Sequence, residues 1–178
     1  MRLFVGLPLP EAALEVLEEV QAGLDTGRPV VPENLHLTLA FLDDQPEIVA
    51  EAVHHALAAL GLPGLAIRFV GVEAKGRGRV KLVWARAEGP PELARLRDAV
   101  RGAVRAAGVD LPRERFRPHV TLARFGAGGA DAARLAPWLA EVAGLTAGPY
   151  PLDRFCLYRS TLTPEGPIYD VLAEYDLV

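Results

Sequence analysis

The chain has 178 residues, a formal net charge of −4 at neutral pH and one cysteine. This length predicts a single domain that buries a core without needing a metal or a disulfide, and one cysteine excludes an internal disulfide. The negative charge excludes a protein that holds nucleic acid over its whole surface, so an anionic ligand needs a local patch of positive charge.

Apolar runs and helical spacing predict alternating strands and helices over the first half of the chain. The strands are expected at 2–7, 34–42, 65–73 and 79–87, and the helices at 10–24 and 46–60. No run is long enough to cross a membrane, and the first is a strand and not a signal peptide, so we expect a cytoplasmic protein with no membrane partner. His54 and His55 flank the apolar stripe of the second helix. Adjacent helix residues diverge by about 100°, so a solvated face is a better interpretation than a metal pair.

Four basic residues alternate around the turn between the third and fourth strands: Lys75, Arg77, Arg79 and Lys81. In an extended backbone they would lie on one side, where they could follow a phosphate chain. An ordinary charged strand edge that discourages aggregation explains them equally well. The sequence leaves both interpretations open.

The second half of the chain continues this alternation. Helices are expected at 90–107 and 131–142, and strands at 119–124, 145–148, 152–162 and 168–177. Pro137 falls inside the later helix, where proline removes a backbone hydrogen bond, so this helix could be broken there. Cys156 sits in an apolar strand and is expected in the core rather than at a reactive site.

One short pattern, H-[LV]-T-L-A, occurs twice, and the second copy begins 83 positions after the first. Each copy lies in an apolar run typical of a strand, where residues i and i+2 share a face. His36 and Thr38 therefore share one face, as do His119 and Thr121, with aliphatic residues on the other side. Two near-identical copies that hold two of the four histidines favour a functional pair over chance.

The order of elements around the two copies is similar. Strand, helix, H-x-T strand, helix and strands precede residue 88, and helix, H-x-T strand, helix and strands follow it. This predicts an internal duplication within a single bilobal domain over 1–178. The expected fold class is α+β, with two pseudo-symmetric lobes, each a mostly antiparallel sheet with helices packed outside, and an active-site cleft between the lobes. Because no linker is apparent, the lobes should share one core.

Two histidines and two threonines that converge on a cleft favour paired general acid and base catalysis. A zinc site normally needs three or four ligands, and no Cys, Asp or Glu pattern supplies the others, so we expect no metal. A threonine nucleophile would need a base and an orienting group that the pattern lacks. Displacement at phosphorus suits a histidine pair, because the attacking and leaving atoms lie on opposite sides and hydroxyls can donate to the phosphoryl oxygens.

The chain resembles the two-histidine phosphoesterase superfamily, in particular its bacterial and archaeal RNA 2',3'-cyclic phosphodiesterases, also called 2'-5' RNA ligases. The two motifs with their flanking residues, the opening strand and the closing 160–169 segment carry the resemblance. It implies hydrolysis of RNA 2',3'-cyclic phosphate to a 2'-phosphomonoester with neither metal nor cofactor. It also implies His36 as general acid and His119 as general base, with 2'-5' ligation as a side activity.

The resemblance further implies that Phe41 and Arg124, which follow the two motifs, contact the phosphate or the nucleotide. Strand alternation opposes this, because each lies an odd number of residues from its histidine and should face away unless the strand bulges. Arg113, Arg115 and Arg117 share the face of the second histidine. They could hold an RNA backbone or form a solvated edge.

The expected partners are RNA ends or small cyclic nucleotides as substrate, with no protein partner and a monomeric state. Two other functions remain open. One is a nucleotide- or RNA-end-binding module with little turnover. The other is a phosphodiesterase for small cyclic nucleotides or ADP-ribose cyclic phosphate.

Overall fold

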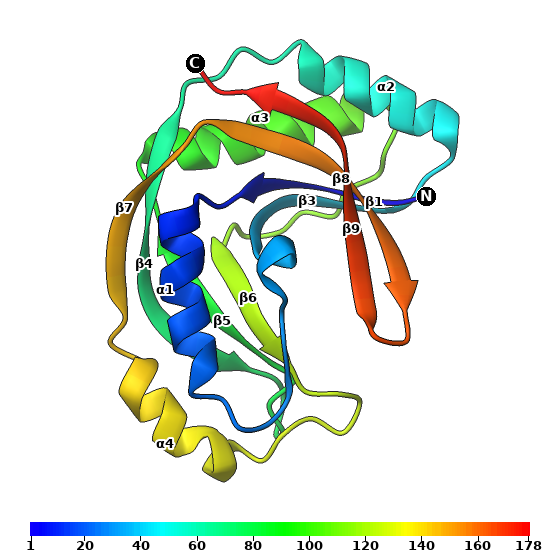
Figure 1. Cartoon of the computed structure of the whole chain (residues 1–178). Coiled ribbons are helices and arrows are strands. Elements are labelled where there is room, and N and C mark those ends of the chain that lie inside the picture. The colour runs from blue at the N-terminus through cyan, green and yellow to red at the C-terminus, as the bar shows by residue number, and fades with distance from the viewer.

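Nine strand segments and four α-helices make up the computed structural model, which describes residues 1–178 (Figure 1). The elements in chain order are β1 (Arg2–Pro8), α1 (Glu11–Ala22), β2 (Arg28–Pro29), the 3-10 turn η1 (Pro32–Asn34), β3 (His36–Asp44), α2 (Glu47–Ala58), β4 (Leu65–Lys75), β5 (Leu82–Glu88), α3 (Pro91–Ala106), β6 (His119–Arg124), α4 (Ala132–Val142), β7 (Thr146–Leu152), β8 (Arg154–Thr163) and β9 (Gly166–Asp176).

All nine strands belong to one curled sheet in which every pair of neighbours is antiparallel. The order is β7-β4-β5-β6-β3-β1-β8-β9, and the short β2 pairs with β6 beside this path. At the middle of the order, β3 meets β6 through the pair Leu37 and Val120. The predicted α+β class with mostly antiparallel strands is confirmed, and the two halves of the sheet are continuous across this pair.

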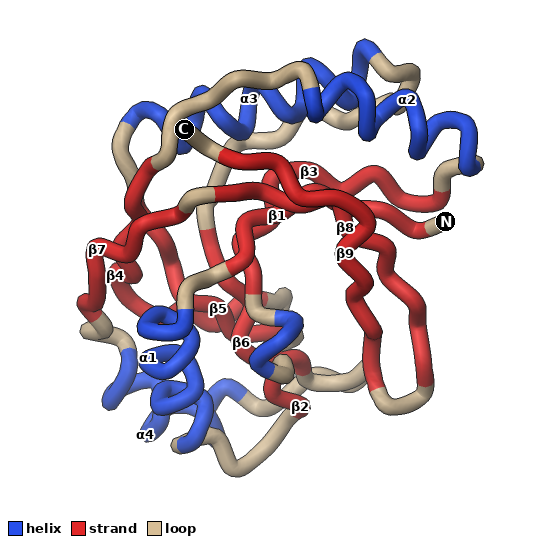
Figure 2. The backbone as a smooth tube through the Cα atoms, turned by 45° about the horizontal axis from the view of Figure 1, so that its top comes forward, coloured by secondary structure: helices blue, strands red, loops and turns tan.

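Each half of the sheet carries its own two helices. α2 and α3 pack against one another and against β9 and β3, whereas α1 contacts β6 and β7, and α4 contacts β4. Figure 2 shows these two helix pairs on opposite parts of the curled sheet. Both halves of the sheet take strands from before and after residue 88, so the two halves of the chain interleave. The internal duplication itself stays a prediction. None of the helices is long and apolar enough to cross a membrane.

One continuous core joins the two halves of the sheet, as the lack of a linker predicted. It contains 41 buried residues, and both Leu37 and Val120 at the junction are completely buried within it. The aliphatic sides of both H-x-T strands therefore face this core. Cys156 lies in a small separate cluster with Phe4 and Tyr158, which confirms the expected buried position of the thiol.

Three differences between the structure and the sequence prediction have a clear physical reason. β3 begins at His36 rather than at residue 34, because η1 occupies the residues before it. α4 is continuous through Pro137, which lies on its exposed side, where water can bond to the carbonyl group that proline leaves free. β7 extends to Leu152 and contains Pro149 and Pro151. It is an edge strand that pairs only with β4, and an edge position tolerates residues without an N–H donor.

Candidate active site

The pairing of β3 with β6 brings the two H-x-T patterns side by side. Leu37 pairs with Val120 and both point into the core, so the residues that flank them point to the opposite face. That face borders a cleft of about 740 Å³. The cleft is lined by all four polar residues of the two motifs: His36, Thr38, His119 and Thr121.

A β-bulge on β3 places Phe41 in the same cleft. Thr38 and Ala40 pair with consecutive residues of β1, so Leu39 between them is an extra residue. One extra residue reverses the alternation beyond it, and Phe41 therefore returns to the face of His36. Phe41 lines the cleft with 47% of its surface exposed. The expectation from strand alternation that it faces away is wrong.

β6 contains the equivalent bulge, with the same effect on Arg124. Thr121 and Ala123 pair with consecutive residues of β5, so Leu122 is the extra residue. Arg124 therefore returns to the face of His119 and lines the cleft. Here too the expectation from alternation is wrong. Both motifs show two consecutive buried residues at the bulge, and the apolar Leu-Ala dipeptide is the only trace of it in the sequence.

Both histidines are held in the same way by the backbone. Nδ1 of His36 lies 2.7 Å from the carbonyl oxygen of Asn34, and Nδ1 of His119 lies 2.7 Å from that of Arg117. A carbonyl oxygen can only accept, so Nδ1 carries a proton in each ring and Nε2 is the position that gains or loses one. In neutral His36, Nε2 accepts a hydrogen bond of 2.9 Å from the Thr38 hydroxyl.

His36 lies among aromatic rings. Its ring centroid is 4.7 Å from that of Phe4, 5.4 Å from that of Tyr169 and 6.1 Å from that of Tyr158. Burial removes water from the imidazole and lowers the pKa of His36 to about 4. The Nδ1 hydrogen bond opposes this change, while the other histidine and Arg124 add to it by repulsion. The neutral form of His36 is therefore stable in the free protein near pH 7.

His119 has a different neighbour, the indole of Trp84. The two rings stack with centroids 3.9 Å apart and an interplanar angle of 25°. Nζ of Lys75 lies 4.6 Å from the centre of the Trp84 ring, and Trp84 Nε1 donates a 3.1 Å hydrogen bond to Glu73. Burial lowers the pKa of His119, its backbone hydrogen bond opposes this, and repulsion from Arg124 and Lys75 adds to it.

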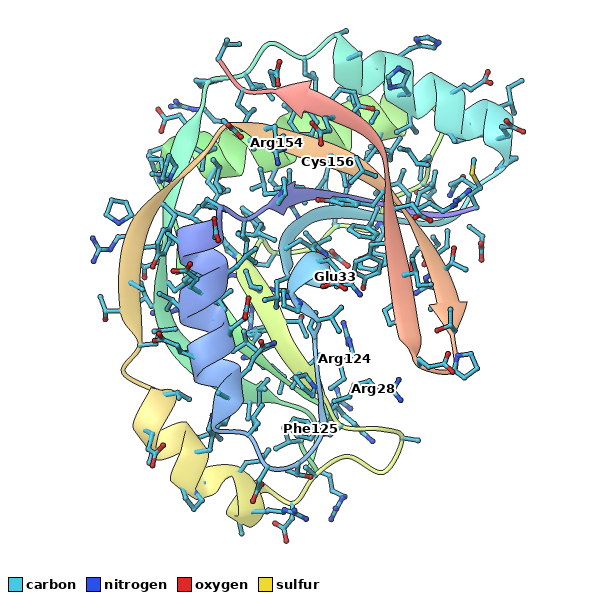
Figure 3. All side chains as sticks on the ribbon, in the orientation of Figure 1. Arg28, Glu33, Arg124, Phe125, Arg154 and Cys156 are labelled. Carbon is cyan, nitrogen blue, oxygen red and sulfur yellow. The ribbon has the colours of Figure 1, made fainter.

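Positive charge gathers along the cleft although the whole chain is negative. The charged residues that line it are Arg28, Arg97, Arg101, Arg115, Arg117 and Arg124, with only Glu114 and Glu165 of opposite charge. Among these arginines only Arg97 has a carboxylate within ion-pair distance, Asp98 at 3.2 Å. Arg28 and Arg124 lie side by side near the β8–β9 hairpin (Figure 3). The cleft thus contains the local patch that an anionic ligand requires.

Sequence reasoning identified some of these arginines and missed others. Arg115 and Arg117 line the cleft as one of the two interpretations expected, whereas Arg113 does not. Arg28 was missed because it lies on a strand of two residues that leaves no periodic pattern. Arg97 and Arg101 were missed because arginines on an amphipathic helix look like its solvated face.

Asn34, which sequence reasoning also missed, connects His36 to the wall of the cleft. Its side-chain Nδ2 donates a 2.9 Å hydrogen bond to the carbonyl oxygen of Pro167, at the tip of the β8–β9 hairpin. Its own carbonyl oxygen accepts the proton of His36 Nδ1. Asn34 is 7% exposed, so this link is shielded from water. The hairpin also contributes Tyr169 to the lining of the cleft.

Other candidates lie outside the cleft. His54 and His55 are exposed on α2, which confirms the solvated interpretation, and His54 Nδ1 shares a 2.9 Å hydrogen bond with Tyr175. In the basic turn, Arg79 and Lys81 bond to carbonyl groups of the 127–129 segment, and the turn does not line the cleft. This favours a structural role for it. No group of three or more His, Cys, Asp and Glu side chains is arranged to hold a metal ion.

Comparisons with known proteins give the same family as the motifs. Residues 8–163 match the model of the 2'-5' RNA ligase superfamily. A relative from Thermus thermophilus, named RNA 2',3'-cyclic phosphodiesterase, is 40% identical, and the match covers 99% of this chain and 90% of the relative.

Solved structures agree with the sequence comparison. The fold is similar to that of TT0787 from Thermus thermophilus, with a TM-score of 0.78 and 33% identity over 99% of this chain and 98% of that one. It is equally similar to E. coli LigT complexed with 3'-AMP, with a TM-score of 0.79 and 27% identity over 99% and 97% of the two chains. The resemblance to two-histidine phosphoesterases is thereby confirmed, and the chain belongs to the 2'-5' RNA ligase superfamily.

Proposed function

We propose that this protein hydrolyses RNA 2',3'-cyclic phosphate ends to 2'-phosphomonoesters, with His36 and His119 as general acid and base. One observation carries the proposal. Two histidines, each held through Nδ1 by a backbone carbonyl, present Nε2 from neighbouring strands to one arginine-lined cleft. Relatives named RNA 2',3'-cyclic phosphodiesterase support the substrate class, and the LigT structure with 3'-AMP shows a nucleotide bound to a protein of similar fold.

The reaction is an in-line displacement at phosphorus. His119 takes a proton from water through Nε2, the water oxygen forms a bond to phosphorus, and the bond from phosphorus to the 3' oxygen breaks. His36 gives its Nε2 proton to that departing oxygen. The product keeps its phosphate on the 2' oxygen and carries a free 3' hydroxyl. This division of roles follows the family resemblance, because the two motifs are nearly symmetric.

Because the pKa of His36 is low in the free protein, the bound substrate must help to protonate this histidine. In the free protein, burial keeps His36 neutral near pH 7, and a neutral imidazole cannot act as the acid. The bound cyclic phosphate carries a negative charge beside the ring, and an opposite charge raises the pKa of an imidazole. His36 therefore gains its proton together with the substrate, and the acid is formed where it is needed.

The remaining site residues hold the phosphate anion and the nucleobase of the substrate. When a phosphate occupies the cleft, the hydroxyls of Thr38 and Thr121 donate to its non-bridging oxygens, and Arg124 adds a guanidinium. The exposed ring of Phe41 offers a surface on which a nucleobase stacks. The same site run in reverse joins a cyclic phosphate end to a 5'-hydroxyl in a 2'-5' linkage, which we propose as a side activity.

One assay tests the proposal. Purified protein in EDTA is given an oligoribonucleotide with a 2',3'-cyclic phosphate end, and the position of the phosphate in the product is identified. We expect a 2'-phosphate, formed at a rate that EDTA does not reduce. Binding without turnover would indicate an RNA-end-binding module. Turnover of small cyclic nucleotides or ADP-ribose cyclic phosphate alone would also contradict the proposal, and a 3'-phosphate product would contradict the geometry of displacement.

A further inference from the structure

Three arginines of α3 reach the segment that leads into β6. Arg97, Arg101 and Arg105 follow one another at a spacing of four residues, which places them on one side of the helix. Each donates one hydrogen bond to a backbone carbonyl of the 111–114 segment, at 2.7 Å for Arg97 and 3.2 Å for Arg105. These bonds explain a structural role for all three, because they hold an irregular segment against the helix.

The structural role uses one N–H donor of Arg101 and one of Arg97, whose guanidinium also bonds to Asp98 and lies 5.4 Å from the centre of the Phe116 ring. Both side chains line the cleft, whereas Arg105 makes the same kind of bond and does not. Arg101 is only 4% exposed and forms no ion pair. The one carboxylate bound to Arg97 is that of Asp98, which is itself exposed. The acidic Glu114 also lines the cleft, but its carboxylate pairs with neither arginine.

A buried cation without a counter-ion is costly. Burial and the repulsion from Arg97 and Arg105 lower the pKa of Arg101, and the weaker attraction of the more distant Glu114 and Asp98 only partly opposes this. A guanidinium has five N–H donors, and the backbone bond of Arg101 uses one. An anion that enters the cleft would compensate the charge and accept the remaining donors. Phosphate suits a guanidinium best because its oxygens match the planar fork.

The order of residues along the chain places this group at one end of the catalytic histidines. Arg115 and Arg117 come just before His119, whereas Arg124, whose charge acts on both histidines, lies after it at the end of β6. The arginines of α3 bond to the segment before β6 and therefore belong to the first end. Arg124 thus belongs to the reacting phosphate, and the arginines before β6 form a second group of positive charge in the same cleft, whose volume of about 740 Å³ has room for more than one phosphate.

We propose that Arg97 and Arg101, with Arg115 beside them, bind the phosphate on the 5' side of the terminal nucleotide of the RNA. This inference rests on the proposed function, since it names the part of the strand that the same cleft holds. A strand whose 3' end carries the cyclic phosphate continues only in the 5' direction. The protein therefore prefers the end of a strand to a free nucleoside cyclic phosphate.

The test compares two nucleotides that differ only in this phosphate. The affinities of adenosine 2',5'-bisphosphate and adenosine 2'-monophosphate are measured by calorimetry, so the result does not depend on turnover. In the wild type we expect the 5'-phosphate to tighten binding about tenfold or more, as charge-assisted hydrogen bonds to a buried cation do. The ratio of the two affinities should fall close to one in Arg101→Gln, and Arg97→Gln should lower it as well.

The matched control is Arg105→Gln, which loses the same kind of bond to the 111–114 segment at a residue that does not line the cleft. It should keep the wild-type ratio of affinities. A ratio near one in the wild type would overturn the proposal, and so would an equal loss in Arg105→Gln, which would leave only the structural role. If Arg101→Gln does not fold, Arg97→Gln decides. An absence of cyclic phosphate hydrolysis with an intact ratio would refute the proposed function and leave this subsite standing.

Discussion

The half-buried imidazole of His36, packed among aromatic rings, should make the folded protein sensitive to mild acid. A histidine whose pKa is lowered by folding resists protonation in the native state and accepts a proton in the unfolded state. Between the two pKa values the unfolded state therefore binds more protons, and the free energy of unfolding falls as the pH falls. His36→Gln removes the titrating group while keeping a polar side chain of similar length, and it should remove this part of the pH dependence.

The size of the effect follows from the two pKa values of His36. It is 6.5 in the unfolded chain and about 4 in the folded protein. Linkage then predicts that protonation of this histidine lowers the free energy of unfolding by little at pH 7, by about 2 kcal/mol at pH 5 and by about 3 kcal/mol at pH 4. Stability from this residue is thus fully present above pH 6.5 and is lost as the pH falls toward 4.

Urea denaturation at pH 7 and pH 5 measures this effect in the wild type and in His36→Gln. The wild type should lose about 2 kcal/mol more than the variant between the two pH values. A change at exposed His55, His55→Gln, should leave the wild-type loss unaltered and serves as the control. Equal losses in the wild type and in His36→Gln would refute the burial argument, as would a pKa near 6.5 for His36 in an NMR titration of the folded protein.

Three further predictions concern catalysis. Because the pKa values of His36 and His119 are both lowered, the bell-shaped pH profile of kcat/KM should have its maximum below pH 6.5. The pH profile of kcat should lie at higher pH, because the substrate anion raises the pKa values of both histidines. A maximum above pH 7 for kcat/KM would contradict this. Thr38→Ala and Thr121→Ala should each slow turnover by a factor of about 10²–10³, with the fold intact by circular dichroism. Wild-type rates in these variants would show that the two hydroxyls take no part in catalysis. A substrate whose leaving group needs no proton should restore turnover to His36→Ala but not to His119→Ala; the opposite pattern would exchange the two roles.

The sequence was sufficient to predict the parts of the site that obey simple alternation. A polar residue at every second position of an apolar strand has one face available to it, so the pattern alone placed the histidines and threonines of the two motifs together. The fold class followed from the order of strands and helices. These predictions rest on periodic patterns, which are local properties of the chain.

The two bulges could not be predicted in the same way. Leu39 and Leu122 look like ordinary core residues, and only the pairing with β1 and β5 shows that each is an extra residue. Since a bulge depends on the neighbouring strand, the sequence of one strand does not reveal it. The alternation rule therefore placed Phe41 and Arg124 on the wrong face. Both line the cleft, and the ligand contact that the family resemblance implies for them stays a prediction.

Site residues that come from distant elements of the fold could not be predicted from the sequence either. Arg101 reaches the cleft because α3 packs on the strand that carries the first histidine, and Asn34 acts through a hairpin more than a hundred residues away. Neither residue belongs to a motif, and each would be assigned to a helix surface or a turn by local reasoning. Tertiary contacts alone give them a place in the site.

The central claim is that two histidines act as one unit on a cyclic phosphate. It is tested most directly by single-turnover hydrolysis of a 2',3'-cyclic phosphate-ended oligoribonucleotide by the wild type, His36→Ala, His119→Ala and the double variant. Each single variant should lose roughly 10²–10⁴ of the rate, or about 3–5 kcal/mol of transition-state stabilisation. The double variant should be little slower than either single one, because each step needs both groups. A single variant that retains the wild-type rate, or losses that multiply in the double variant, would contradict the account.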